Sequence, residues 1–204
     1  MESPDTFTLL PLHMDPTTKT ISSTQNPVPH ALEAELASLN TLHRSLLSVD
    51  TPTGTPPPPV PVNPKRSAQI TKLRESGNNE FRKSNYAMAI RMYSLAIEMA
   101  LGRPGWEPSG LVREEVSGLY ANRAQANMAL GNWAEGAVDA ECSVEMKKVG
   151  NAKGWWRRGR CLLEMGRLEE GLEWVGKALE FEASEGDLLG LKREIETKIA
   201  QRKR

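Results

Sequence analysis

The chain has 204 residues, of which 39% are hydrophobic and 25% charged, and these proportions are typical of a globular protein. Its 26 basic and 26 acidic side chains give a net charge of zero. Residues 1–64 hold 2 basic and 6 acidic side chains, and residues 65–204 hold 24 basic and 20 acidic ones. Because the two signs are interspersed in residues 65–204, the continuous basic track of a nucleic-acid-binding surface is excluded. No stretch approaches the roughly 20 apolar residues of a membrane span and MESPDTFTLL lacks the pattern of a signal peptide, so we expect a cytosolic protein that reaches a membrane only through a partner.

The first fifty residues predict a small α+β segment. TFTLLPLHMDPTTKTISS is typical of two short strands, near Phe7–Leu12 and Lys19–Ser22, around a turn at Asp15 and Pro16. The stretch after it predicts one helix with a single apolar face, made by Leu32, Leu36, Leu39, Leu42, Leu46 and Val49. One hairpin and one such helix bury too little surface to be independently stable. Residues 1–50 therefore either pack on the rest of the chain or dock on another protein, and the pattern alone favours neither.

Residues 51–66 predict a proline-rich linker. Half of TPTGTPPPPVPVNP is proline, which neither continues a helix nor pairs within a sheet. Fully extended, the segment would reach about 40 Å, so it would let the parts on either side move apart.

Residues 67–203 repeat one pattern three times, near 70–103, 117–150 and 152–185. In each repeat a small residue on a first helix comes seven residues before a turn, and a large and then a small residue follow on a second helix. The first small residues are Gly77, Ala124 and Gly159; the turn residues are Ser84, Gly131 and Gly166; the later pairs are Tyr86 and Ala89, Trp133 and Gly136, and Leu168 and Gly171. This is the pattern of a tetratricopeptide repeat (TPR), a pair of antiparallel helices with a period of about 34 residues.

The ends of the array also have sequence signals. Gly77 and Ala124 are 47 residues apart, against 35 for Ala124 and Gly159, so LGRPGWEPSGLVREE lengthens the first connection. DLLGLKREIETKIAQRK predicts a helix near 187–202 that caps the last repeat. The predicted fold is therefore all-α, a three-repeat TPR array with a C-terminal capping helix, plus the small N-terminal segment of a hairpin and one helix.

No catalytic or metal-ligating constellation stands out. The three histidines, His13, His30 and His43, lie before the repeats, and none has a metal-ligating neighbour at helical spacing. GLEWVGKA superficially matches a phosphate loop but lacks its hydroxyl residue and preceding strand. We expect a protein that is not an enzyme and that uses no metal or cofactor.

Polar residues on the three first helices predict an anion-binding groove, because these helices line the concave surface of a TPR array. The residues are Arg74 and Asn78, then Asn122, then Lys153 and Arg157. Cations and asparagine N–H groups suit carboxylates. Phe81 and Met128, one turn further along their helices, predict either an apolar floor of the groove or ordinary packing between helices. Arg158 and Arg160 are expected to point elsewhere, into solvent.

These residues resemble the dicarboxylate-clamp subclass of TPR domains, which grips the C-terminal Glu-Glu-Val-Asp tails of cytosolic heat-shock chaperones. The matching stretches are RESGN, YANRA and AKGWWRRG, and the departure is Arg74, where the subclass usually has lysine. The resemblance implies that Arg74, Asn78 and Asn122 hold the terminal carboxylate. It implies that Lys153 and Arg157 hold the aspartate side chain and the upstream backbone. It does not separate the 70-kDa from the 90-kDa chaperone class.

The chain as a whole resembles the non-spanning TPR subunit of the fungal post-translational Sec translocon. AIEMALGRPGWEP in the long connection, the N-terminal segment and the proline-rich linker carry this resemblance. It implies that residues 1–50 dock on a membrane-anchored translocon subunit at the cytosolic face of the ER, while the TPR domain receives a chaperone. The alternatives are a soluble cochaperone adaptor and the regulatory TPR subunit of an enzyme.

Overall fold

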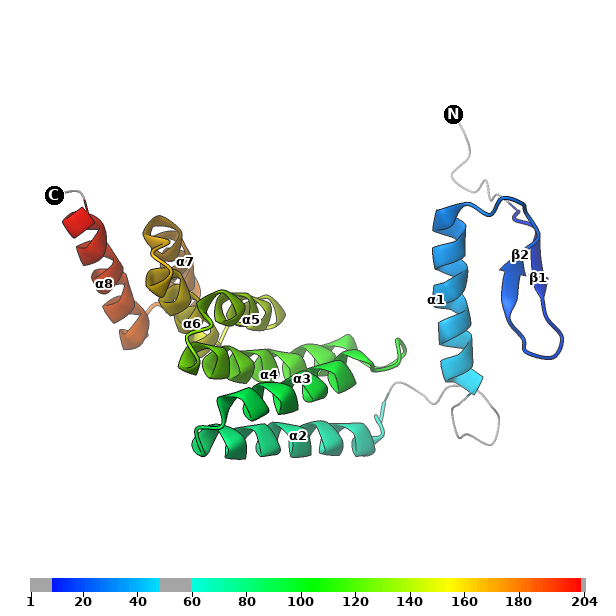
Figure 1. Cartoon of the computed structure of the whole chain (residues 1–204), viewed down its shortest axis with the longest axis horizontal. Helices are drawn as coiled ribbons and strands as arrows, with labels where there is room; N and C mark the ends of the chain where they lie inside the picture. Colours follow the sequence, from blue (N-terminus) through cyan, green and yellow to red (C-terminus); the bar gives the residue numbers. More distant parts are fainter. Residues whose placement is uncertain (1–8, 48–59, 203–204) are drawn as a thin grey trace. The chain divides into compact units, whose positions relative to one another are not determined.

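The computed structural model describes residues 9–47 and 60–202, which belong to two units, a small N-terminal one and a larger helical one (Figure 1). The N-terminal unit contains strand β1 (Leu12–Met14), strand β2 (Ile21–Ser23) and helix α1 (His30–Leu47). The strands pair antiparallel, with Leu12 opposite Ser23 and Met14 opposite Ile21. Among the described helices of both units, none is both long enough and apolar enough to cross a bilayer.

The first strand begins later than the sequence predicts. Phe7 and Thr8 lie outside the described residues, and residues 9–11 are not in a strand; β1 instead ends directly at the turn. The Asp15 carboxylate accepts hydrogen bonds from the backbone N–H groups of Thr17 and Thr18, at 2.8 and 2.7 Å. This capped turn aligns the residues on either side of it, so pairing starts there and not further back in the apolar run.

Helix α1 is attached to the hairpin through Asn40. Its side-chain oxygen accepts from the Ile21 N–H, and its amide donates to the Ile21 carbonyl, both at 2.8 Å. Leu36 is the buried residue of the predicted leucine face, whereas Leu39 and Leu42 remain 42% and 43% exposed. Val49, the last residue of that predicted face, lies outside the described residues. The N-terminal unit thus leaves much of its apolar helix face uncovered by its own hairpin.

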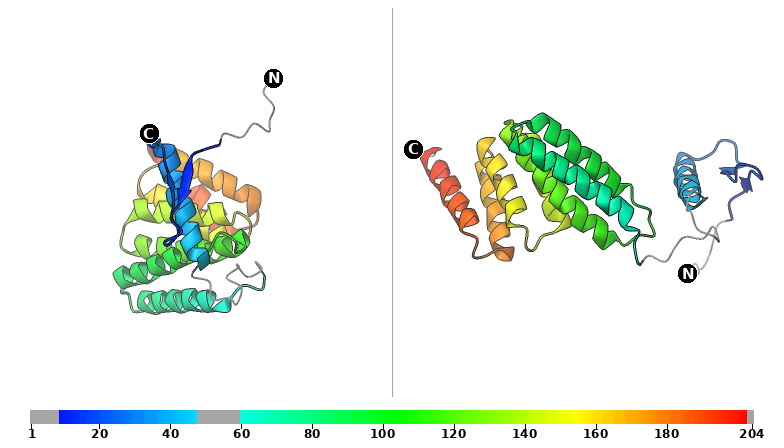
Figure 2. Two further views of the ribbon diagram at one scale, coloured as in Figure 1. Left: turned by 90° about the vertical axis from the view of Figure 1, so that its right-hand side faces the viewer. Right: turned by 90° about the horizontal axis from the view of Figure 1, so that it is seen from below.

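The larger unit is a stack of antiparallel helix pairs with a last single helix (Figures 1 and 2). The pairs are α2 (Pro64–Arg82) with α3 (Tyr86–Leu101), α4 (Ser109–Ala129) with α5 (Trp133–Met146), and α6 (Ala152–Glu164) with α7 (Leu168–Phe181). Helix α8 (Gly186–Arg202) packs on α6 and α7. The prediction of an all-α TPR array with a capping helix is confirmed.

Two boundaries differ from the sequence-based ones. Helix α2 begins at Pro64, inside the predicted linker, because Asn63 caps it by accepting a hydrogen bond from the Lys65 N–H at 3.0 Å. Helix α4 begins at Ser109, so half of the lengthened first connection is helical and only residues 102–108 are a loop. The rest of the predicted linker, up to residue 59, lies outside the described residues.

The lengthened connection is anchored by Arg103, whose side chain is fully buried. Its guanidinium donates to both carboxylate oxygens of Glu115 on α4, at 2.9 and 2.7 Å, and to the Ser67 hydroxyl on α2 at 2.7 Å. It also forms an ion pair with Glu107. The hydrogen bonds that Arg103 donates to the carboxylates of Glu115 and Glu107 raise its pKa. The charge of this buried arginine is therefore balanced within the fold.

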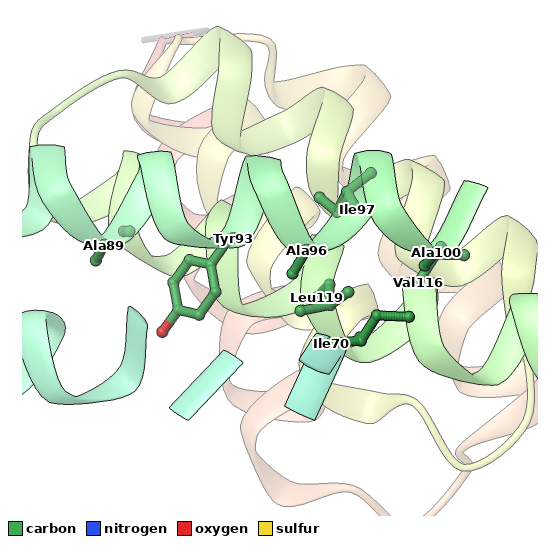
Figure 3. Packing of buried hydrophobic residues seen from close by; sticks show 9 residues of the cluster. Ile70, Ala89, Tyr93, Ala96, Ile97, Ala100, Val116 and Leu119 are labelled. Atoms are coloured by element: carbon green, nitrogen blue, oxygen red, sulfur yellow. The ribbon is translucent and has the colours of Figure 1, made fainter. Parts of the chain in front are cut away.

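The core of the first repeat lies between α2, α3 and α4, with Tyr93 at its edge (Figure 3). Tyr93 is 2% exposed, and its ring packs against Gly77 of α2 so closely that a Cβ at Gly77 would lie 2.5 Å from the ring. Ala89 and Ala96 of α3 are completely buried in the same cluster. The small residues that define the repeat are therefore the points of closest approach between paired helices.

Substitution of Gly77 tests this contact. Gly77→Ala forces the Tyr93 ring to move, so we expect the free energy of unfolding to fall by about 1–3 kcal/mol. The matched control is Gly118→Ala, since Gly118 lies on the exposed side of α4 with no atom within 4 Å of an added Cβ. That change should raise stability by about 0.4–1 kcal/mol. Urea denaturation of the full chain measures both; equal effects of the two substitutions would contradict the close-approach interpretation.

Candidate functional site

The seven predicted site residues lie on the three first helices. Arg74, Asn78 and Phe81 are on α2, Asn122 and Met128 on α4, and Lys153 and Arg157 on α6. Asn78, Phe81 and Asn122 line a cavity of about 150 Å³, and Phe81, Met128, Lys153 and Arg157 line a larger one of about 970 Å³. Phe81 and Gln125 line both cavities, so we treat the two as one groove. Arg74 is exposed and lines neither cavity.

The two asparagines are joined at the narrow part of the groove. The Tyr93 hydroxyl donates to the Asn78 side-chain oxygen at 2.7 Å, and the Asn122 amide donates to the same oxygen at 3.2 Å. Burial raises the pKa of Tyr93, so its hydroxyl remains a donor at neutral pH. With its oxygen used twice, Asn78 has its NH₂ group left to donate. This arrangement orients side-chain N–H groups for an acceptor that the described part of the chain does not provide.

Arg157 is the unusual residue of the site. It is only 9% exposed, and its sole hydrogen-bond partner in residues 9–47 and 60–202 is the neutral side chain of Gln125, at 2.6 Å. Burial lowers the pKa of Arg157, and no carboxylate opposes that effect. By contrast, Arg103 pairs with two glutamates and Arg123 with Asp139, at 2.7 Å. A buried charge without a counter-charge is costly, so this position is suited to an anion from outside.

Lys153 is the second residue of α6 and is exposed, with no ion pair in the described part of the chain. The start of α6 is fixed by Asn151, whose side chain accepts from the Gly154 N–H and donates to the Ser143 carbonyl on α5, at 3.2 and 3.1 Å. The first turn of α6 contains no acidic residue. Because the positive end of a helix favours anions and disfavours cations, Lys153 there adds to an already positive local field.

The expectation that Arg158 and Arg160 point into solvent is wrong. Arg158 forms ion pairs with Glu141 of α5 and Glu170 of α7, and its guanidinium lies 4.5 Å from the centre of the Trp174 ring. Arg160 pairs with Glu164 at 2.6 Å and with Glu194 of α8 at 2.9 Å, and it lines the groove. Glu164 is four residues after Arg160 on the same helix, but the other three partners lie on helices too distant in sequence for the local pattern to reveal them.

Several groove residues were not predicted. Gln125 lies three residues after Asn122 on α4, a spacing that places both on one helix face and would have identified it. Trp133 and Trp156 also line the larger cavity, although aromatic residues in a repeat are ordinarily assigned to its core. Within the described residues, no three His, Cys, Asp or Glu side chains are grouped as they would be to hold a metal ion.

The contrast between the two buried arginines is testable without any ligand. Arg157→Met removes an uncompensated charge and returns the exposed Gln125 amide to water, so we expect stability to stay equal or to rise by about 1–4 kcal/mol. Arg103→Met leaves two carboxylates without their partner and should lower stability by up to about 3–5 kcal/mol. Urea denaturation of both variants checks this; a large loss with Arg157→Met would mean that Arg157 is structural.

Comparisons with known proteins identify the family of the chain and proteins that share its fold. The chain matches no family model. It is 35% identical over 150 residues, 72% of this chain and 78% of the relative, to the ER protein translocation subcomplex subunit sec67 of Schizosaccharomyces pombe.

Two solved structures share the fold. One chain of the Sec complex from S. cerevisiae matches with a TM-score of 0.74 and 24% identity, over 93% of this chain and 98% of that one. The second TPR domain of human RPAP3, solved with the HSP70 peptide SGPTIEEVD, matches with a TM-score of 0.54 and 21% identity, over 64% of this chain and 98% of that one. These likenesses establish a TPR fold, and the sequence relationship to sec67 goes further: the chain belongs to the family of this non-spanning TPR subunit of the ER protein-translocation complex.

Proposed function

We propose that the chain is a non-catalytic adaptor in post-translational protein translocation into the ER. Its groove binds the C-terminal Glu-Glu-Val-Asp tail of a cytosolic heat-shock chaperone of the 70-kDa class. Its N-terminal unit docks on a membrane-anchored translocon subunit, which holds the protein at the cytosolic face of the ER membrane. Membership of the sec67 family supports the translocation role, and the groove supports the peptide role.

The observation that carries the peptide role is the buried, uncompensated charge of Arg157 beside the free N–H groups of Asn78 and Asn122. A C-terminal aspartate carries two carboxylates on one residue, the terminal carboxylate and that of its side chain. Asn78 and Asn122 donate to the terminal carboxylate, and Lys153 and Arg157 hold the aspartate side chain and the upstream backbone. Arg74 is exposed and outside both cavities, so in this proposal it adds attraction at longer range and contributes less.

An apolar residue before the terminal aspartate would meet Phe81 and Met128. Both are partly buried and line the larger cavity, and the Phe81 ring lies 5.2 Å from that of Tyr86. Phe81 also packs against the core of the first repeat. These side chains therefore serve both the fold and the proposed valine site, and the two interpretations of the sequence pattern are compatible.

The N-terminal role rests on the open apolar face of α1. Leu39 and Leu42 are each more than 40% exposed on a unit that buries little else. A soluble cochaperone, the main alternative, has no need of a membrane-anchored partner, so membrane recruitment separates the two functions. The regulatory subunit of an enzyme would instead copurify with a catalytic chain.

The peptide role predicts which variants lose affinity. Binding at micromolar strength corresponds to about −8 kcal/mol, and a hydrogen bond to a charged group contributes roughly 1.5–3 kcal/mol. Lys153→Ala and Arg157→Met should therefore each weaken binding of the peptide SGPTIEEVD by roughly tenfold to a hundredfold. Amidation of the peptide's terminal carboxylate should do the same, and added salt should weaken the wild type more than either variant. Fluorescence anisotropy measures all four effects.

The matched control is Lys177→Ala, which removes an exposed lysine of α7 that is paired with Glu173 and lies outside the groove lining. It should change affinity less than twofold. Arg160 is unsuitable as a control because it lines the groove. Unchanged affinity for the amidated peptide, or an equal loss with Lys177→Ala, would reject the clamp in favour of a general charged surface.

The membrane role makes a separate prediction. Leu39→Gln combined with Leu42→Gln makes the open face of α1 polar, so we expect co-sedimentation of the full chain with ER microsomes to weaken by roughly tenfold to thirtyfold, from about 1 kcal/mol of lost burial per leucine. Ala37→Gln, on the exposed opposite side of α1, is the control and should leave recruitment intact. Wild-type protein that fails to sediment with microsomes would favour the soluble cochaperone.

A further inference from the structure

The groove continues well beyond the predicted clamp. Past Lys153 and Arg157 its lining extends over Trp156 to Glu185 and Asp187 at the start of α8, and to the buried Leu188. The lining follows the order of the stacked helices: Asn122 is on α4, the cations Lys153 and Arg157 are on α6, and the two carboxylates are at the start of α8, while α6 contacts both α4 and α8. A ligand that crosses the groove from α4 to α8 would be an extended chain with a carboxylate at its α4 end and a cation at its α8 end.

The two carboxylates at the far end have no counter-charge of their own. Neither Glu185 nor Asp187 forms an ion pair within residues 9–47 and 60–202, and both are exposed. The neighbouring groove residue Glu164 differs, because Arg160 neutralises it at 2.6 Å. Acidic residues at a helix start stabilise the helix by themselves. Their place in the same groove as the uncompensated Arg157 is the additional observation, since it makes the whole groove complementary to a dipolar peptide.

We infer that Glu185 and Asp187 form a subsite for a lysine or arginine upstream of the anionic C-terminus, so that the preferred ligand is a C-terminal tail with carboxylates at its end and a cation several residues before it. This inference rests on the proposed tail binding and names the class of tail. It assigns to the capping helix α8 a part in selecting the ligand as well as in covering the last repeat.

The distance fixes the position of the cation. Helix α6 contacts both α4 and α8, and packed helices lie about 8–10 Å apart, so the path from Asn122 on α4 to α8 is roughly 16–20 Å. An extended chain covers about 3.3–3.6 Å per residue, so this path takes about five residues. The cation is therefore expected near the fifth residue before the terminal one. Trp133 and Trp156 line the same cavity, where their side chains are available to contact an apolar residue of the ligand.

A pair of peptides tests the subsite. In SGPTIEEVD the fifth residue before the terminal aspartate is threonine; SGPRIEEVD differs from it only by arginine at that position. For the wild-type chain we expect SGPRIEEVD to bind about threefold to tenfold more tightly than SGPTIEEVD, because its arginine would form exposed ion pairs with two carboxylates. In the double variant Glu185→Gln with Asp187→Asn the two peptides should bind within twofold of each other, as measured by fluorescence anisotropy.

The matched control is Glu180→Gln with Glu196→Gln, which changes the net charge equally at exposed positions outside the groove lining and should keep the preference for SGPRIEEVD. A preference that survives in the Glu185 and Asp187 double variant would assign it to overall charge and overturn the subsite. Tail binding would still stand if Arg157→Met weakened SGPTIEEVD. If Arg157→Met left SGPTIEEVD unaffected, the proposed function would fail, and this inference with it.

Discussion

The close packing of each first helix on its second helix determines where the groove residues lie. At Gly77 the approach is so close that a methyl group would overlap the Tyr93 ring, and at Gly159 it would overlap Val175. Because these residues face the neighbouring helix, residues one or two positions away, such as Asn78 and Arg157, are turned toward the groove. The residues at which paired helices pack most closely therefore determine which neighbouring residues face the groove. Tyr93 links the two, because its ring packs on Gly77 and its hydroxyl donates a hydrogen bond to the side-chain oxygen of Asn78.

The sequence was sufficient for the array because its determinants repeat. The small residues recur at nearly constant spacing, and the turn between paired helices has a positive φ at Ser84, Gly131 and Gly166, three equivalent positions. The sequence was insufficient where a single contact between distant residues decides the structure. Arg103 orders the long connection through residues on two other helices, and Asp15 sets the position of the hairpin. Because neither contact recurs along the chain, no repeating sequence pattern could reveal it.

The same distinction applies to the groove. Lys153 and Arg157 were recognisable because helical spacing places them on one face, and six of the seven predicted residues do line the groove. Arg74 satisfies the spacing but lies outside both cavities. The partners of Arg158 and Arg160 come from α5, α7 and α8 as well as α6, so their neutralisation required the three-dimensional structure. Local spacing identified which cations share a face, and tertiary contacts determined which of them keep a free charge.

Gln125 explains how that free charge is preserved. A glutamate at this position would have almost the same shape and would pair with Arg157 permanently, as Glu115 pairs with Arg103. The amide instead supplies an oxygen that orients the guanidinium, at 2.6 Å, without neutralising it. The cost is a buried charge that the described residues do not balance. Under the proposed function, binding of an anionic tail would recover that cost, and selectivity for such a tail would follow from a carboxylate that the groove lacks as much as from the cations that it contains.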